Sequence, residues 1–351
     1  MNLNSTRYLL GVLQGLKRPK RFLTELAFPT VVTFQTESVT IDVKTKRRRL
    51  APFVSPFVAG KVMREQAWSS NTFTPAYVNP INALTPKNAL KRAPGESIGG
   101  DPNMTAAQRQ QIRLAEILSD QAESIIRRIE YMGAEILRLA QCTVTGEGYD
   151  TKVLTFGRNS NLRTVLTSSD LWSDPDSDPL GDLRAKFSLM HKVEGAVATD
   201  VVFEPDGKDA FLAHPKVQEY LKLIGGLNTK IEGMDAGFQA GIVAYAGLEG
   251  VEYLGRIGNV RYWAYEEFYE DDNGADQSLL PSGEVIVLGV RDYAGVRLHG
   301  AILDEAAGYQ ALEIFPDSWV EKNPRARMVS STSAPLPAPG RVNASASMKV
   351  L

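Results

Sequence analysis

Cysteine is almost absent from this 351-residue chain, which contains only Cys142. A single thiol excludes an intramolecular disulfide framework and any cysteine cluster for zinc or an iron–sulfur centre. Long apolar runs are also missing, since no stretch approaches the length of about 18 apolar residues that a membrane span needs. The apolar residues 8–13 precede the basic cluster 17–21, which reverses the order in an export signal. We therefore expect a soluble protein of a reducing cytoplasm, with no membrane partner.

The chain has little excess charge of either sign. Its 39 Lys and Arg residues nearly balance 41 Asp and Glu residues, so the formal net charge is -2. Proteins that hold duplex DNA by neutralising its phosphates carry a basic excess, so any nucleic-acid contact should be local and without sequence specificity. A hydrophobic content of 43% with 23% charged residues is typical of a globular chain that buries a sizeable core.

Residue patterns that carry catalysis are also missing. The three histidines, His191, His214 and His299, lie far apart in the sequence, and no HExxH pair occurs. There is no GxSxG elbow, no Walker-type phosphate loop and no GxGxxG that opens a helix. We therefore predict no catalytic residue, no metal and no cofactor, and we interpret His214 and His299 as structural.

One acidic segment, 271–276, resembles the start of a calcium-binding loop, because oxygen-bearing side chains surround a turn glycine. It lacks the distal glutamate of such loops. The favoured alternative is a hairpin between strands at 261–269 and 284–288, with Asn273-Gly274 as its turn.

What the chain does contain is one long helical pattern at 105–141. Thr105 and Gln108 have the spacing of a capping box. Apolar residues then recur at three- and four-residue steps, at Leu114, Leu118, Ala122, Ile125, Ile129, Met132, Ile136 and Leu139. The helix would span roughly 55 Å. A coiled coil is the alternative, but strand-like residues at 143–145 and 152–156 follow at once, which favours a helix lying along a sheet.

The tract 31–94 contrasts with this helix. Residues 1–28 before it are typical of an amphipathic helix and a basic elbow. Residues 39–43 alternate as in a half-buried strand, and a basic run at 44–49 follows. Seven prolines and glycines at 52, 56, 60, 75, 80, 86 and 94 then leave room only for short strands. Such a tract buries little apolar surface by itself. We therefore predict an extended loop whose burial and backbone hydrogen bonds are supplied by a neighbouring copy of the chain.

A second lobe is predicted after the Asp-, Ser- and Pro-rich segment 170–181. It should contain a strand at 197–203 that ends in a turn at 205–207, a helix at 209–224 and hairpin-rich sequence at 244–303. Another strand is predicted at 327–332. Strands and helices that mix without regular alternation indicate the α+β class.

Several short segments, taken in order, resemble one family. They are 53–62 (FVSPFVAGKV), 73–80 (FTPAYVNP), 143–147 (TVTGE), 287–289 (VLG), 315–319 (FPDSW) and 333–335 (SAP). Their order, with the long helix between the second and third, resembles the lambda-type tailed-phage major head proteins, the major capsid protein E family. No segment is diagnostic alone, whereas their collinearity from about residue 30 to 337 is specific.

The resemblance implies the Hong Kong 97-like phage capsid fold. Carried onto this sequence, it places an N-terminal arm at 1–30 and an extended β loop at 31–100. A peripheral domain would combine 101–165, including a spine helix at 105–141, with 314–351. The axial domain would be 166–313.

The resemblance also implies function. A major capsid protein self-assembles from many copies into pentamers and hexamers of the icosahedral head shell, in the bacterial host cytoplasm, and encloses double-stranded DNA in the virion. A separate scaffolding protein, a portal, a maturation protease and often a decoration protein would be its partners. It would not be an enzyme. Lys61 and Asn343 are of the types that cross-link in some relatives, but we predict no cross-link.

The extended loop should supply most contacts between subunits. The residues that we select for this role are Arg47, Arg48, Arg49, Lys61, Arg64, Trp68, Phe73 and Tyr77. Two alternatives remain at this point: an encapsulin-type cellular shell protein of the same fold, and an α+β enzyme of unknown class.

Overall fold

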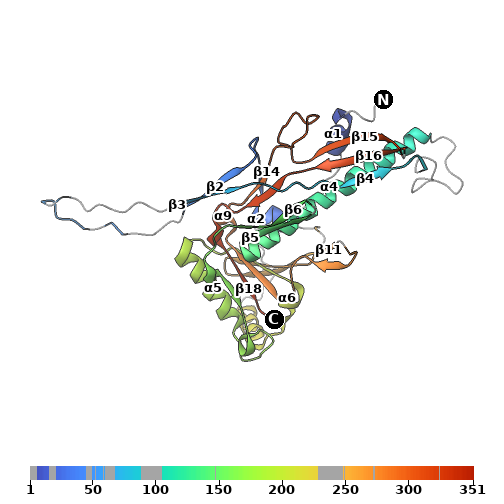
Figure 1. Ribbon diagram of the computed structural model, residues 1–351. Helices are drawn as coiled ribbons and strands as arrows, with labels where there is room; N and C mark the ends of the chain where they lie inside the picture. The colour runs from blue at the N-terminus through green and yellow to red at the C-terminus, as the bar shows by residue number, and fades with distance from the viewer. Residues whose placement is uncertain are drawn as a thin grey trace.

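The computed structural model describes most of the chain, with gaps. The described residues are 6–15, 21–44, 50–51, 53–57, 59, 68–87, 105–146, 148–227, 248, 250–271, 273–323 and 325–351. A long helix crosses the body, a narrow β-hairpin projects from one side, and a sheet flanked by helices lies below (Figure 1). The fold mixes helices and sheets, as the sequence predicts.

The long helix, α4 (Ala106–Leu139), forms where the sequence predicts it. Its first turn is closed by a capping box: the Thr105 hydroxyl accepts a hydrogen bond from the Gln108 nitrogen, and the Gln108 side chain accepts one from the Thr105 nitrogen. The 34 residues extend over about 50 Å. The helix ends two residues earlier than predicted, because Ala140 adopts a left-handed conformation with φ of 54° and the next strand begins directly after it.

The apolar stripe of α4 faces the body along its whole length, which confirms the predicted pattern. Near the N-terminal end, Leu114 and Leu118 pack against Val329 of a neighbouring sheet. Ile129 belongs to a second cluster further along, and Ile136 belongs to the largest cluster of the molecule. One helix therefore connects three separate regions of core.

A three-stranded sheet lies beside α4, in the order β15–β16–β4. Its strands are β15 (Phe315–Lys322), β16 (Arg325–Thr332) and β4 (Ile81–Leu84), all antiparallel. The side-chain amide of Gln121 in α4 donates to the carbonyl oxygen of Val329 at 2.9 Å, so the helix and the sheet are joined by a buried polar contact as well as by packing. β16 is the strand predicted at 327–332, and it begins two residues earlier.

Both ends of the tract 31–94 pair with the body. Near its start, β1 (Thr30–Thr33) runs parallel to β14 (Val296–His299), which also pairs with β17 (Pro335–Ala338). Towards its end, β4 pairs with β16. The expectation that this tract lacks partners within its own subunit is therefore wrong at both ends. The partners come from the last 60 residues of the chain, so local sequence does not reveal them.

The N-terminal segment packs onto its own subunit. Its first helix, α1 (Thr6–Gly15), is the amphipathic helix that the sequence predicts, and a short second helix, α2 (Phe22–Ala27), follows. Leu9 and Leu13 of α1 are buried against the apolar stripe of α4. The described part of this segment thus adds a layer to the body.

A buried carboxylate holds α2 in place. Oε1 of Glu130 accepts hydrogen bonds from the Leu23 nitrogen at 2.7 Å and from the Tyr265 hydroxyl at 2.8 Å. Oε2 accepts from the nitrogen of Thr24 at 2.9 Å and from its hydroxyl. Burial raises the pKa of Glu130, and the four hydrogen bonds act in the opposite direction. The side chain therefore fastens the start of α2 to both α4 and the sheet below.

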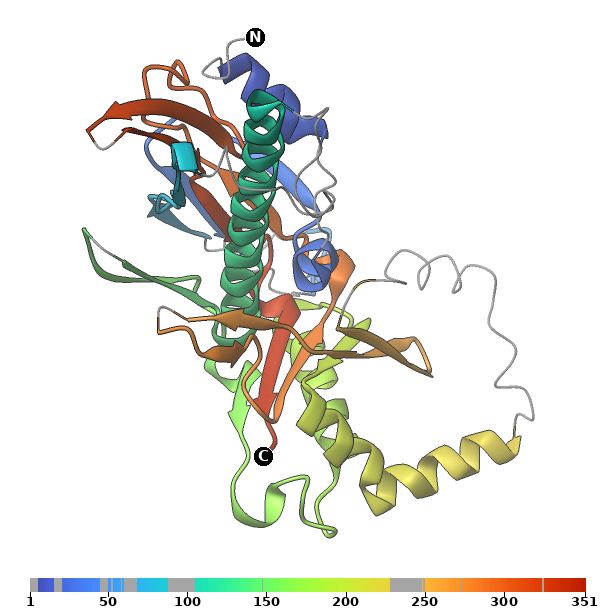
Figure 2. The same ribbon diagram turned by 90° about the vertical axis from the view of Figure 1, so that its right-hand side faces the viewer.

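That sheet has six strands, in the order β7–β18–β13–β8–β10–β9. They are β7 (Arg163–Val165), β18 (Ser345–Lys349), β13 (Glu284–Leu288), β8 (Asp200–Phe203), β10 (Val260–Tyr265) and β9 (Val251–Ile257). Val285 and Val287 of β13 point to one face and Ile286 and Leu288 to the other, as alternation along a strand requires. The first face packs against three helices, seen well in Figure 2. These are α5 (Pro179–Glu194), α6 (Pro205–Ala213) and α7 (Pro215–Leu227).

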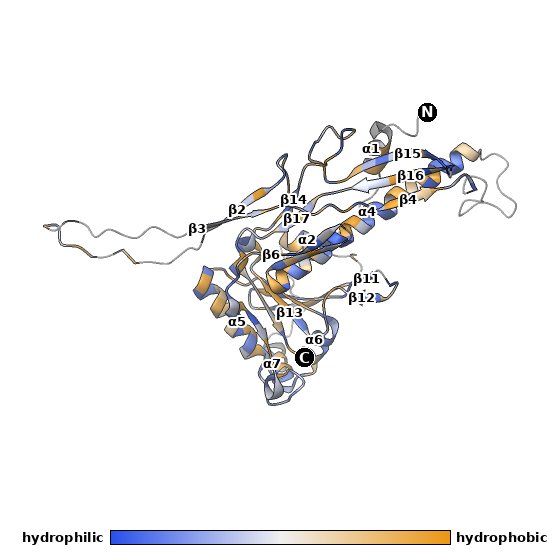
Figure 3. Ribbon diagram, in the orientation of Figure 1, coloured by the Kyte–Doolittle hydropathy of each residue, from blue (hydrophilic) through white to orange (hydrophobic). Residues whose placement is uncertain are grey.

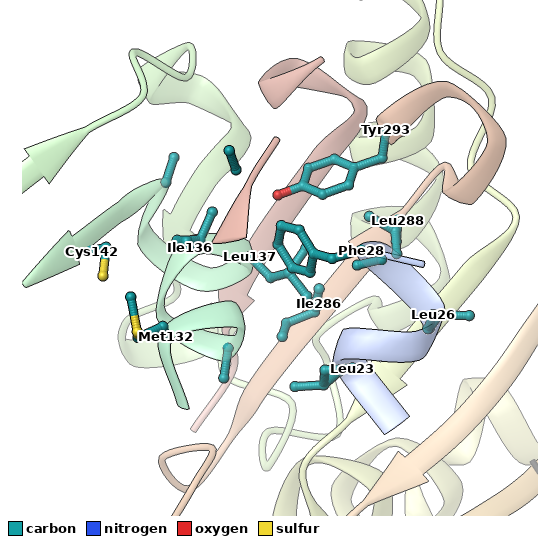
Figure 4. Close-up of a cluster of buried hydrophobic side chains, with 14 of the residues drawn as sticks. Leu23, Leu26, Phe28, Met132, Ile136, Leu137, Cys142, Ile286, Leu288 and Tyr293 are labelled. Atoms are coloured by element: carbon teal, nitrogen blue, oxygen red, sulfur yellow. The ribbon is translucent and has the colours of Figure 1, made fainter. Parts of the chain in front are cut away.

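The other face of the sheet meets the end of α4 in the largest core cluster (Figure 4). Phe28, Leu137, Ile286 and Tyr293 come from four different segments and are almost fully buried there. Phe28 and Tyr293 meet edge to face, with ring centroids 5.5 Å apart. Other elements of the body are β5 (Gln141–Gly146), β6 (Tyr149–Thr155), α9 (Val290–Tyr293) and the short turns η1 (Ser160–Leu162), η2 (Ser168–Asp170) and η3 (Val342–Ala344).

Predicted elements of the second lobe need correction. The strand predicted at 197–203 begins only at β8, and the helix predicted at 209–224 is two helices, α6 and α7. The predicted turn at 205–207 is the first turn of α6, where the Glu204 carboxylate accepts from two backbone nitrogens. A proline stands at the start of each helix, a position where its missing N–H has no cost.

The hairpin predicted between 261–269 and 284–288 is wrong. β10 pairs with β8 and β9, whereas β13 pairs with β8 and β18. The Asn273-Gly274 turn does close a hairpin, but a smaller one, between β11 (Phe268–Glu270) and β12 (Asp276–Ser278). β10 and β13 are mostly buried central strands, and their long-range partners override the local turn signal.

Ile129→Asp should lower the free energy of unfolding by about 3–5 kcal/mol, because it places a carboxylate without a partner in a buried cluster. Thermal unfolding followed by circular dichroism measures the effect. Ile112→Asp is the matched control, since Ile112 lies on the same helix but is 38% exposed, and it should cost less than about 1 kcal/mol. Equal melting temperatures for the two variants would contradict the assignment of the buried face.

Cys142 should react very slowly in the native protein. Burial raises the pKa of its thiol to about 12, so at pH 8 only about one molecule in 10⁴ carries the reactive thiolate. Because the pKa is raised, reactivity should appear only as the pH approaches 12 or when the chain unfolds. Ellman's reagent at pH 8, with and without guanidinium, measures this, and fast labelling of the folded protein would contradict it.

Candidate assembly surface

The β-hairpin that projects from the body consists of β2 (Val39–Lys44) and β3 (Trp68–Phe73). The strands pair antiparallel in continuous register, from Val39 opposite Phe73 to Lys44 opposite Trp68. The strand predicted at 39–43 is confirmed, and β3 is one of the short strands for which the proline-rich tract leaves room. In Figure 1 the hairpin extends away from every other described element.

The base of this hairpin is fixed in the subunit. Phe73 is only 5% exposed and packs against Phe156, with ring centroids 5.1 Å apart. Val39 and Ile41 also pack on the largest core cluster. Just beyond β3, the Tyr77 hydroxyl donates to the Ala301 carbonyl oxygen at 2.7 Å. The arm is therefore positioned by the core, and the contact with a neighbour predicted for Phe73 disagrees with this burial, because little of its surface is left for a partner.

Three bulky apolar side chains in the segment between the two strands are fully exposed. Leu50, Phe53 and Phe57 are exposed by 95%, 107% and 95% of their reference areas. They lie in the chain between β2 and β3, and Figure 3 shows apolar colour near the tip of the projecting segment. Isolated apolar residues are common on protein surfaces, but several fully exposed ones close together in the chain indicate an interaction site. Our sequence-based selection omitted them, although aromatic residues in a proline-rich tract were a usable signal.

The other residues selected from the sequence are placed only in part. Arg47, Arg48, Arg49, Lys61 and Arg64 lie outside the described residues, and so does the side chain of Trp68, whose backbone belongs to β3. Their role in subunit contacts stays a prediction. Tyr77 does lie at a surface groove.

That groove has a volume of about 290 Å³ and lies between α4 and β5. Tyr77 and Val78 line it together with Tyr131 and Met132 of α4 and residues of β5. The guanidinium of Arg128 lies 5.8 Å from the centre of the Tyr131 ring, a cation–π contact at the rim. The lining is part apolar and part polar, which suits a peptide segment.

A second hairpin, β11–β12, is exposed on the body. The Asp271 carboxylate fixes its turn by accepting from the nitrogens of Asn273 at 2.8 Å and Ala275 at 3.0 Å. These backbone hydrogen bonds lower the pKa of Asp271. Its oxygens thus serve the turn, as the hairpin interpretation expects, and the described residues contain no group of three or more side chains suited to a metal.

The three histidines do not share a site. His191 lies on α5, His214 between α6 and α7, and His299 on β14. The His214 ring is held on both sides: Nδ1 accepts from the Lys216 nitrogen at 3.3 Å, and Nε2 lies 3.1 Å from the Asp174 carbonyl oxygen. The His214 ring therefore has a structural role.

Within the described ranges, no helix has the length and apolar character to span a bilayer.

Asn343, considered above for a cross-link, is engaged inside the subunit. It is buried, its Oδ1 accepts from the Asn159 nitrogen at 2.8 Å, and its Nδ2 donates to the Glu194 carboxylate at 3.2 Å. Lys61 lies outside the described residues. The absence of a cross-link stays a prediction, and the burial of Asn343 favours it.

Comparisons with known proteins agree with this arrangement. The major capsid protein of Escherichia phage lambda is 28% identical over 347 residues, which cover 96% of each chain. The P21 prophage-derived major head protein of Escherichia coli O6:H1 is 27% identical over 343 residues, with the same coverage.

Among solved structures, a capsid protein of a prophage in E. coli CFT073 matches with a TM-score of 0.77 at 19% identity, over the whole of both chains. A phage-related protein from Bordetella bronchiseptica RB50 matches with a TM-score of 0.51 at 12% identity, over 98% and 96% of the two chains. These two likenesses show a shared fold. The family model described as phage major capsid protein E matches residues 5–350. The chain therefore belongs to the phage major capsid protein E family.

Proposed function

We propose that copies of this chain assemble as pentamers and hexamers into the icosahedral head shell of a tailed phage and enclose double-stranded DNA. Membership of the family makes the chain a capsid protein of the virion rather than an enzyme. The observation that carries the assembly mechanism is the β2–β3 hairpin, which is fixed in the core at its base and bare at its far end.

Burial of that far end drives the contact. Covering a large apolar side chain gains about 1.5–3 kcal/mol, so Leu50, Phe53 and Phe57 stabilise a complex in which a neighbour covers them. Because the arm and the surface that receives it differ, the contact is head to tail, and such contacts close into rings when the rotation between subunits permits. Each contact can be modest, since many act together in a closed shell.

The proposal includes the Hong Kong 97-like division of the chain. The projecting β2–β3 hairpin and the long helix α4, which lies beside the β15–β16–β4 sheet, support it. The peripheral part, 101–165 with 314–351, and the axial part, 166–313, share the six-stranded sheet, because β7 and β18 come from the former and β13, β8 and β10 from the latter. On this division, the six-stranded sheet joins the peripheral part to the axial part.

Contacts with the neighbour are proposed for the basic and aromatic residues of the arm. These are Arg47, Arg48, Arg49, Lys61, Arg64 and Trp68, together with Tyr77 at the groove. We assign Phe73 a supporting role inside the subunit.

A scaffolding protein, a portal and a decoration protein are proposed as partners by analogy with the family. The family match favours a phage head protein over an encapsulin, and no observation favours an enzyme.

Removing residues 45–67 tests the proposal. Lys44 and Trp68 are directly opposite in the hairpin register, so a two-residue Asn-Gly turn can join them without disturbing the base. The shortened chain should unfold within a few degrees of the intact chain, because the core is untouched, but it should remain monomeric.

Sedimentation velocity and electron microscopy of the two proteins measure the difference. The intact chain should form shells or ring-like capsomers under the same conditions. Shells formed equally well by the shortened chain would show that assembly does not depend on the arm.

A further inference from the structure

We propose that residues 301–311 of one copy of this chain dock in the groove between α4 and β5 of a second copy, and that the second copy returns the same contact. The projecting segment is called the 301–311 loop below, and the groove is the one that Tyr77, Tyr131 and β5 line. The inference rests on the proposed function, and it adds a two-fold contact between copies to the head-to-tail contact of the arm.

The 301–311 loop has a fixed backbone. Across its base, the nitrogen of the buried Ile302 donates to the Gln310 carbonyl oxygen at 3.1 Å. Inside the loop, the Asp304 side chain accepts from the Ala306 nitrogen at 2.7 Å, and the Asp304 carbonyl oxygen accepts from the Tyr309 nitrogen at 3.2 Å. The loop therefore holds its exposed side chains in place before a partner binds, which lowers the entropic cost of binding.

Two large side chains of this loop are presented to solvent. Leu303 is 68% exposed, and Tyr309 is 59% exposed. Tyr309 also has a φ of 55°, a left-handed conformation that costs a residue with a side chain about 1–2 kcal/mol and that glycine adopts freely. A tyrosine that is strained, and whose ring is mostly in solvent, indicates a role for that ring at the surface.

The loop and the groove have complementary charges. Glu305 is exposed, and it forms no ion pair with any residue that the structure describes. Arg128, at the rim of the groove, is exposed as well; it contacts the Tyr131 ring but no carboxylate of the described chain. Of the described residues that line the groove, none is Asp or Glu. Opposite charges of this kind set the partner and the orientation of a protein interface.

The size and lining of the groove suit side chains from a loop. Its volume of about 290 Å³ is at the lower end of the range of about 300–1,000 Å³ that is common for ligand pockets. Tyr131 gives it an aromatic surface, and Met132 gives it a flexible thioether that adapts to the shape of a partner. Leu303 and Tyr309 thus find apolar surface there, with Arg128 beside them for Glu305.

The loop and the groove lie on the same side of one subunit. The hydroxyl of Tyr77, which lines the groove, donates to the carbonyl oxygen of Ala301 at the base of the loop, at 2.7 Å. In Figure 2 the loop that follows β14 and the β5–β6 hairpin both lie to the left of α4. A projection and a recess on one side are what a two-fold contact needs, because the loop of each copy then reaches the groove of the other.

The two contacts have different consequences for assembly. The head-to-tail contact of the arm closes into rings, whereas a two-fold contact joins two copies and is then complete. Copies that make both contacts connect one ring to the next. Loss of the two-fold contact should therefore leave rings that do not join into a closed shell.

A charge exchange tests the contact. One variant carries Glu305→Arg, a second carries Arg128→Glu, and a third carries both. Each single reversal should lower the fraction of protein in closed shells by at least about tenfold at physiological salt while rings persist, because like charges then meet twice in every pair of copies. The double variant should recover most of the shells. Sedimentation velocity and electron microscopy separate shells from rings, and circular dichroism checks that each variant is folded.

The matched control uses a carboxylate at another place on the surface. Glu321 is exposed on β15, so Glu321→Arg combined with Arg128→Glu has the same net charge as the double variant. This control should not restore shells. Equal rescue by the control, or no rescue by the double variant, would overturn the contact.

Tyr309→Gly separates a role in the contact from a role in folding. Glycine removes the strain of the left-handed φ, so the melting temperature should stay within a few degrees of the unmodified value or rise. The fraction of closed shells should nevertheless fall at least about tenfold, because a large aromatic side chain is lost from the centre of the contact. An unchanged yield of shells would show that this ring lies outside the interface.

A disulfide trap tests the two-fold symmetry. Thr145 is exposed in β5 and lines the groove. In assembled Leu303→Cys, Thr145→Cys protein, oxidation with copper phenanthroline should link the same two copies twice, so a non-reducing gel should show dimers. Each single substitution should give monomers, and the native Cys142 is buried. A ladder of longer oligomers, or no dimer, would overturn the two-fold contact.

The outcomes separate this inference from the proposed function. If the unmodified chain forms shells, and the substituted chains form them equally well, only the two-fold contact is wrong. If the unmodified chain forms no particles, the proposed function fails and the inference fails with it.

Discussion

Burial of the apolar stripe of α4 is the interaction on which the rest of the structure depends. The same face of this one helix covers the β15–β16–β4 sheet at its start, receives α1 along its middle and closes the largest core cluster at its end. Elements from the first 30 residues and from the last 40 meet there, although they are the most distant in sequence. A helix of this length gives the subunit a rigid axis, to which both the arm and the six-stranded sheet are fixed.

Polar groups make these junctions specific. Glu130 connects α4 to α2 and to β10, and Gln121 connects it to β16. At the other end, the Arg158 guanidinium donates to the Leu137 and Arg138 carbonyl oxygens, which lack partners within the last turn of a helix. Burial lowers the pKa of Arg158 to about 10, so it is still charged at neutral pH. Apolar packing alone allows a helix to slide, whereas buried groups that must be hydrogen-bonded allow one register.

The surfaces that α4 does not bury decide what the protein does. Within one subunit, the two strands of the arm pair with each other, whereas Leu50, Phe53 and Phe57 between them are fully exposed. The exposed apolar side chains of the arm suit a subunit whose partners are copies of itself.

Local sequence predicted the features that depend on local physics. The capping box at Thr105 and the spacing from Leu114 to Ile136 determine α4, and the alternation at 39–43 determines β2, because caps and periodicity act within a few residues. Sequence reasoning failed where strand pairing depends on partners far away in the chain. It paired β10 with β13, and it predicted no partner for the ends of the tract 31–94. It also merged α6 and α7 into one helix. For the candidate surface, sequence reasoning identified the arm and its basic run, but it selected Phe73, which is buried, and omitted Phe53 and Phe57, which are exposed.

By itself, then, the sequence determined that this chain has a long amphipathic helix, an extended arm and a family. Only the tertiary structure decided which strands are neighbours, which arm residues are buried and which carboxylates remain in solvent. The physical reason is that burial is a property of the whole packed chain: a side chain such as Phe73 is covered by Phe156, more than 80 positions away, and nothing in its own neighbourhood of sequence records that contact.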